Sequence, residues 1–144
     1  MPLRILLADD QQLIRDGIKA LLEQEGFEVV GAAVNGGEAV RLAQSLNPDV
    51  AVLDLMMPVL SGVAAGEQIL RLCPRTRVLL LTMYSHEHQV LAALRAGIRG
   101  YVVKTQAAED LVDAIRAVIG GKIYLSRGIS GIPGVGNGDK VTVT

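Results

Sequence analysis

The sequence lacks the residues that mark several common classes of protein. It has one cysteine, Cys73, which excludes an intrachain disulfide and favours a reducing compartment. No apolar run approaches the roughly 20 residues that a membrane span needs. The N-terminal apolar run is followed at once by two acids, which is typical of a first strand rather than a signal peptide. We therefore expect a cytoplasmic protein that does not enter a membrane.

Basic runs and aromatic residues are scarce as well. The net charge is -1 at pH 7, tryptophan is absent, and aromatic residues make up 3% of the chain. Because no cluster of lysine and arginine attracts a phosphate backbone, we do not expect this chain to bind nucleic acid directly. Half of the 144 residues are hydrophobic, which is enough for one domain with a largely aliphatic core.

Five short apolar runs alternate with five stretches in which apolar residues recur at helical spacing. The runs span residues 3–8, 27–33, 50–54, 77–82 and 100–104. The predicted helix N-caps are Asp10, Asn35, Ser61, Ser85 and Thr105. This alternation predicts an α/β fold with a doubly wound parallel sheet covered on both faces. Right-handed crossovers bring the carboxyl ends of the strands to one edge, where ligands bind in such sheets.

Polar side chains stand at four of those strand ends. They are Asp9 and Asp10, Asp54, Thr82 and Lys104. Three clustered carboxylates repel one another, and a hard cation with oxygen ligands such as Mg²⁺ relieves that repulsion. An ammonium and a hydroxyl beside the cation suit the equatorial oxygens of a phosphoryl group. Asp54, at the centre, has the chemistry of a carboxylate nucleophile that forms an acyl phosphate.

These elements, in this order, resemble the receiver domain of two-component response regulators. Pro58 and Gly62 behind Asp54 belong to the same pattern, and the segments 80–84, 96–104 and 121–126 are similar to the NarL/FixJ (LuxR-type) subgroup. The resemblance covers roughly residues 3–126. It implies a flavodoxin-like sheet of five parallel strands in the order 2-1-3-4-5.

The resemblance also implies a role for each matching residue. Asp54 would accept a phosphoryl group from a sensor histidine kinase, with Lys104 pairing with that group. Thr82 and Tyr101 would change conformation together as the switch. The implied Mg²⁺ ligands are Asp9, Asp10, Asp54 and the backbone carbonyl of Met56. Such a domain catalyses only its own phosphotransfer and slow dephosphorylation, so it is a signalling domain rather than an enzyme.

Relatives of this kind regulate transcription through a C-terminal DNA-binding domain. We expect the receiver domain to span residues 1–126 and residues 127–144 to be a tail of unknown role. Five of the eleven residues from 128 to 138 are glycine, so no helix-turn-helix is expected there and a truncated chain is favoured. Relatives also suggest a homodimer, through the first and fifth helices or through the face of the fourth helix, fifth strand and fifth helix.

The sequence departs from the family pattern at two positions, and its fold is also compatible with two other classes of function. Thr105 stands where the family often has a proline after the lysine, and Met83 is bulkier than the usual residue after the switch threonine. A phosphorylation-independent interaction module is the main alternative, although such relatives tend to lose the acidic set. An enzyme on the same fold is disfavoured, because no phosphate-cradling loop follows the first strand and position 56 lacks the second acid of an Asp-x-Asp phosphohydrolase.

Overall fold

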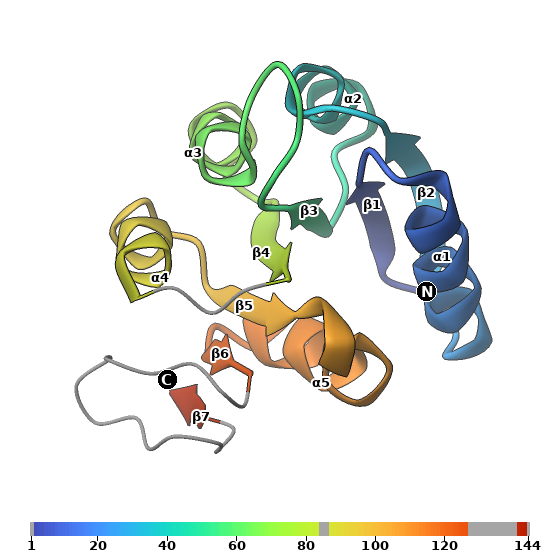
Figure 1. Ribbon diagram of the computed structural model, residues 1–144. Helices are drawn as coiled ribbons and strands as arrows, with labels where there is room; N and C mark the ends of the chain where they lie inside the picture. Colours follow the sequence, from blue (N-terminus) through green and yellow to red (C-terminus); the bar gives the residue numbers. More distant parts are fainter. Residues whose placement is uncertain (1, 84–86, 127–140, 144) are drawn as a thin grey trace.

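A computed structural model describes residues 2–83, 87–126 and 141–143 of the chain, with helices packed on both faces of one sheet (Figure 1). The strands are β1 (Arg4–Ala8), β2 (Glu28–Ala33), β3 (Val50–Asp54), β4 (Arg77–Thr82), β5 (Gly100–Val103), β6 (Ile123–Leu125) and β7 (Val141–Val143). The helices are α1 (Gln12–Gln24), α2 (Gly36–Leu46), α3 (Gly62–Leu72), α4 (Glu87–Arg95) and α5 (Ala107–Ile119), with a 3₁₀ turn η1 (Lys104–Gln106) before α5.

The sheet has the order β2-β1-β3-β4-β5-β6-β7, so the predicted order 2-1-3-4-5 is confirmed. The predicted number of strands is too low, because β6 joins β5 in parallel and β7 pairs with β6 in antiparallel fashion. Each added strand has three residues, too few for a pattern in the sequence, and each forms against a neighbouring strand. Residues 127–140 lie outside the described part, so the boundary at residue 126 stays a prediction.

Strand side chains alternate between two apolar layers. Leu6, Leu53 and Leu80 face the layer under α2, α3 and α4. Leu7 and Leu79 face the layer under α1 and α5, on the other side of the sheet (Figure 1). All are fully buried, and each contributes about 1.5–3 kcal/mol through the area it removes from water. The two layers hold the central strands rigidly, and the functional side chains extend from the ends of those strands.

Two of the predicted N-caps are confirmed. The Asn35 side chain accepts a hydrogen bond from the Glu38 amide at 2.8 Å, and Ser61 Oγ accepts one from the Ala64 amide at 3.2 Å. The Glu38 carboxylate accepts from the amide of Val34, the residue before the cap, at 3.2 Å, one position away from the cap amide that a capping box would use. Ser85 lies outside the described residues.

The predictions for Asp10 and Thr105 as caps are wrong. Helix α1 begins after Gln11, whose side chain makes no cap hydrogen bond, and Asp10 is exposed. Helix α5 begins at Ala107 after the turn η1, so Thr105 lies inside that turn instead of at the helix start. The chain leaves β5 through the 3₁₀ turn η1, which is tighter than a turn of α-helix. Lys104 is the first residue of η1.

Gly62 lets the loop after β3 fold back beneath Asp54. Its amide donates a hydrogen bond to the Leu55 carbonyl at 2.8 Å. A Cβ atom at position 62 would lie 2.4 Å from the Asp54 carbonyl oxygen, which no real side chain tolerates. The glycine therefore fixes the path of residues 55–61 around the Asp54 side chain.

Candidate functional site

Side chains from three strand ends meet at one edge of the sheet. Asp9 follows β1, Asp54 is the last residue of β3, and Lys104 follows β5. Lys104 Nζ lies 2.9 Å from Asp9 Oδ2 and 3.0 Å from Asp54 Oδ2. The Lys104 side chain is only 7% exposed and those of Asp9 and Asp54 are 0% and 6% exposed. The sequence placed these residues at a common edge, and the structure brings them into direct contact.

The Asp9 loop is held from both sides. Asp9 Oδ1 accepts a hydrogen bond from the Gln11 amide at 2.9 Å, and the Asp9 amide donates to the Ala33 carbonyl at 3.1 Å. Arg15 donates from its guanidinium to the Asp9 carbonyl oxygen at 2.8 Å. Sequence reasoning missed Arg15, although its position in the first turns of α1 places it within reach of the loop. Asp9 is thus fixed in place, with Oδ2 free to pair with Lys104.

Burial and charge act in opposite directions on Asp54. Burial raises the pKa of Asp54, and the negative charge of Asp9 adds to that increase. Lys104 and the Met56 amide, which donates to Asp54 Oδ1 at 3.3 Å, oppose it without cancelling it. Burial also acts to lower the pKa of Lys104, but the carboxylates of Asp9 and Asp54 outweigh burial and raise it. Lys104 is therefore a permanent cation at neutral pH.

The acidic group has the donor set of a hard-cation site. Carboxylate oxygens of Asp9, Asp10 and Asp54 all lie within 4.8 Å of one another. Two of the acids are buried and Asp10 is exposed, so water can reach the group from one side. Lys104 supplies one positive charge against three carboxylates, which leaves a net negative charge that a divalent cation would neutralise. Oxygen ligands with an open aqueous side suit Mg²⁺, which keeps several of its waters.

A pocket of about 260 Å³ opens over these residues. Its lining consists of Asp10, Gln11, Asp54, Met56, Met83 and Lys104. The Met56 and Met83 side chains are 68% and 51% exposed, so they lie at the rim and do not seal Asp54. Met83 nonetheless lines the approach to Asp54. The role of the Met56 carbonyl as a ligand stays a prediction.

Thr82 and Tyr101 lie on adjacent strands behind the pocket. Thr82 ends β4 opposite Val103, and Tyr101 pairs with Leu80 in the same ladder. Both are 1% exposed. Burial raises the pKa of the Tyr101 phenol, and the nearby Thr82 hydroxyl opposes that increase. The Tyr101 ring packs in the apolar layer under α2, α3 and α4, and its phenol lies beside the Thr82 side chain.

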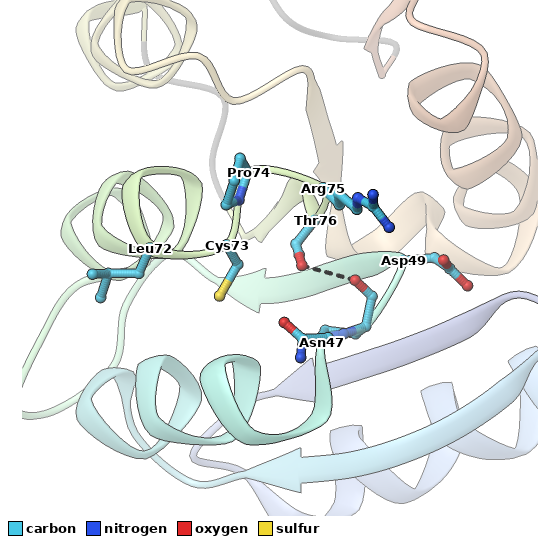
Figure 2. A pocket seen from close by; sticks show the side chains of 8 residues that line it. Asn47, Asp49, Leu72, Cys73, Pro74, Arg75 and Thr76 are labelled. Carbon is cyan, nitrogen blue, oxygen red and sulfur yellow. Dashed lines mark hydrogen bonds between the residues drawn. The ribbon is translucent and has the colours of Figure 1, made fainter.

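A larger pocket, of about 520 Å³, lies at the opposite edge of the sheet, where β3 and β4 begin (Figure 2). Thr76 Oγ1 donates to the Pro48 carbonyl at 2.8 Å, and Asp49 accepts from the Arg4 amide at 2.8 Å. Burial raises the pKa of the Cys73 thiol in its wall, which keeps that thiol neutral. Asp49 is the one acid in the lining. A metal ion therefore finds more carboxylate ligands at the edge of the sheet that carries Asp54.

Comparison with known proteins identifies the family. The profile described as the response regulator receiver domain matches residues 5–116. The chain belongs to the response regulator receiver domain family. Receiver domains take part in two-component phosphorelay signalling, generally bind Mg²⁺ at an acidic pocket, and are signalling domains rather than ordinary enzymes.

Full-length regulators and isolated receiver domains are both among the relatives. The transcriptional regulatory protein LiaR of Bacillus subtilis is 38% identical over 130 residues, which are 90% of this chain and 62% of LiaR. VraR of Staphylococcus aureus is 39% identical over 117 residues, 81% of this chain and 56% of VraR. The chain thus spans about three-fifths of the length of these relatives.

Solved structures agree with this assignment. A LuxR-family response regulator from Aurantimonas superposes with a TM-score of 0.79 at 37% identity, covering 84% of this receiver and 87% of that chain. The signal receiver domain of NarL from Mycobacterium tuberculosis gives 0.78 at 32% identity, covering 83% and 98%. The predicted LuxR-type resemblance is therefore confirmed. In the described part of the receiver no helix has the length and apolar character to cross a membrane.

Proposed function

We propose that this receiver accepts a phosphoryl group on Asp54 from a sensor histidine kinase in the cytoplasm, with Mg²⁺ held by Asp9, Asp10, Asp54 and the Met56 carbonyl. The observation that supports it is the contact of Lys104 Nζ with Asp9 and Asp54, next to a third carboxylate. Neither an inert structural ion pair nor a constitutive docking module requires an extra acid at an open pocket. The alternative of a phosphorylation-independent interaction module is accordingly second.

Each residue of the site has a separate role in the phosphoryl transfer. An Asp54 carboxylate oxygen forms a bond to phosphorus as the bond from phosphorus to the donor nitrogen breaks, and that nitrogen takes up a proton. The bound metal would supply positive charge to the phosphoryl oxygens. Lys104, already fixed beside Asp54, would stabilise the charge that develops on one of them. Thr82 and Tyr101 would then respond to the new charge as the conformational switch.

Intact-mass spectrometry with a small phosphodonor tests this proposal. Incubated with phosphoramidate and Mg²⁺, the receiver should gain the mass of one phosphoryl group. Removing Mg²⁺ with EDTA should suppress that gain, because three carboxylates with one lysine repel an incoming phosphoryl group. A constitutive interaction module would gain no mass under either condition, and that result would overturn the proposal.

A homodimer through α1 and α5 is part of the proposal. A groove of about 290 Å³ runs between these helices. It is lined by Ile14, Gly17, Ile18, Leu21, Ala107, Ala108 and the Lys104 stem, so it is apolar except for that lysine. The alternative face is formed by α4, β5 and α5. The apolar groove favours the interface through α1 and α5, and a second copy of the receiver is the proposed occupant.

Filling the groove should prevent dimer formation without harming the fold. A Cβ at Gly17 meets nothing within 4 Å, so the side chain of Gly17→Arg begins in open space at the groove, and the substitution improves helix propensity. We expect the phosphorylated wild type to run as a dimer in light scattering and phosphorylated Gly17→Arg to run as a monomer. Gln12→Arg, roughly 140° away around α1, is the matched control and should dimerise. A dimeric Gly17→Arg, or a monomeric wild type, would contradict this interface.

A further inference from the structure

One buried hydroxyl joins three elements next to Lys104. Ser126, directly after β6, is fully buried. Its Oγ accepts a hydrogen bond from the Val103 amide at 3.2 Å and donates one to Asp110 Oδ2 at 2.9 Å. Asp110 is 1% exposed and lies in the first turn of α5, which packs beside β5 and β6 (Figure 1). The end of β5, the start of α5 and the end of β6 are thereby tied together.

The Ser126 hydroxyl accepts a hydrogen bond at the point where the ladder between β5 and β6 ends. In the ladder between β5 and β6, Tyr124 lies opposite Gly100 and Leu125 opposite Tyr101, and the ladder stops there. The Ser126 amide donates to the Tyr101 carbonyl at 3.0 Å, but the Val103 amide donates to the Ser126 side chain and does not continue the ladder. A buried amide without a partner would cost about 1–3 kcal/mol. The Ser126 side chain supplies the acceptor instead.

Asp110 sets the direction of that hydroxyl. A carboxylate is an acceptor only, so the hydroxyl hydrogen must point toward Asp110 Oδ2. The oxygen lone pairs are then free to face the Val103 amide. Without Asp110 the hydroxyl could rotate, and the bond to Val103 would lose its fixed orientation. The two side chains therefore act as one unit.

We propose that Ser126 and Asp110 are positioning residues that hold the backbone of Lys104 so that its ammonium reaches Asp9 and Asp54. Val103 is the residue directly before Lys104, and the bond to Ser126 fixes the point from which the lysine side chain extends. Lys104 Nζ contacts both carboxylates at about hydrogen-bond distance, so a small backbone shift moves it away from one of them. This inference rests on the proposed function of Asp54, and it adds residues that touch neither the metal ligands nor the phosphoryl group.

The rate of labelling by phosphoramidate and Mg²⁺ measures the effect. We expect Ser126→Ala to label roughly tenfold to a hundredfold more slowly than wild type, because misplacement of a catalytic group by about 1 Å costs that much. The rates are compared at saturating Mg²⁺, because a displaced Lys104 also changes the charge around Asp9 and Asp54. Asp110→Asn, which keeps an oxygen acceptor, should label faster than Asp110→Ala. Equal rates in these two Asp110 variants would overturn the role of the hydrogen bond.

A matched control separates positioning from stability. Val118→Ala removes buried apolar contacts in α5, in the layer that faces α1, and leaves the Ser126 network intact. It should lower the unfolding temperature at least as much as Ser126→Ala and still label at the rate of wild type. A Val118→Ala variant that labels as slowly as Ser126→Ala would show that lost stability explains the effect, and the positioning role would be wrong.

NMR of the lysine side-chain nitrogens gives a readout without phosphorylation. Lys104 should give a protected ammonium signal in the wild type, because its Nζ is buried between two carboxylates; Lys104→Met assigns it. Ser126→Ala should broaden or remove that signal. A wild-type signal in Ser126→Ala would overturn the inference even if that variant labelled slowly. Wild-type protein that fails to label would instead overturn the proposed function, and the NMR signal would still decide the role of Ser126.

Discussion

Asp54→Asn should abolish labelling by phosphoramidate and Mg²⁺ and at the same time stabilise the receiver. Labelling is lost because the amide lacks the carboxylate nucleophile. Stability rises because wild-type Asp54 is a buried acid near Asp9, with burial as the main cause of its raised pKa. A single stabilising substitution commonly raises the free energy of unfolding by about 0.5–2 kcal/mol. Chemical denaturation without metal, together with intact-mass spectrometry, measures both effects.

The gain in stability should depend on pH in a defined direction. Because the folded-state pKa of Asp54 is raised, the folded receiver binds this proton more tightly than the unfolded chain. The Asp54 contribution to stability is therefore lost as pH rises from the ordinary value of 3.8 through the folded-state pKa. The advantage of Asp54→Asn should be present at neutral pH and vanish in acid. Asp113→Asn, at an exposed acid, should label normally and show no such dependence. An Asp54→Asn variant that still labels would refute the role of Asp54.

Lys104→Met should act in the opposite direction on stability. The substitution leaves Asp9 and Asp54 buried beside each other without their shared cation. Removing one partner of a buried ion pair typically costs about 3–5 kcal/mol. Labelling should also slow by about 10²-fold or more, because a fixed charge beside the transferred group is lost. Denaturation and the rate of mass gain check the two effects.

Mg²⁺ should restore much of the stability that Lys104→Met loses. A cation that binds only the folded state stabilises it by about 2.7 kcal/mol at 100 times its dissociation constant. Without metal, the variant should be more stable in acid than at neutral pH, because protonation of Asp54, whose pKa burial raises, removes the repulsion between the two acids. Lys122→Met, at an exposed lysine, is the control and should match wild type. An equally small effect of both substitutions would mean that Lys104 is not paired with the acids.

The part of the fold that follows from periodicity could be predicted from the sequence. Alternating apolar runs and helical stripes predicted a parallel sheet of five strands, and the resemblance to receiver domains implied their order. The register of a parallel sheet then brings Asp9, Asp54 and Lys104 to one edge. Strand β6 could not be predicted in this way. Its three residues become a strand only because β5 offers a ladder of hydrogen bonds.

Side-chain contacts between residues far apart in the chain could not be predicted from the sequence. The bond between Ser126 and Asp110 joins residues 16 positions apart, and no spacing rule marks it. Arg15 is found only because the loop at Asp9 turns its carbonyl toward α1. Asp10 was predicted both as a helix cap and as a member of the acidic group, and the structure places its carboxylate in that group but not at the cap. In each case a tertiary contact decides the role of the residue.

Chemical mapping of the phosphoryl group decides whether Asp54 is the acceptor. After labelling with phosphoramidate and Mg²⁺, borohydride reduces an aspartyl phosphate to homoserine, which tandem mass spectrometry locates in the digested protein. We expect homoserine at position 54 alone, and none when Mg²⁺ is removed. Homoserine at Asp9 or Asp10, or a phosphorylated protein in which Asp54 is unchanged, would contradict the proposed function.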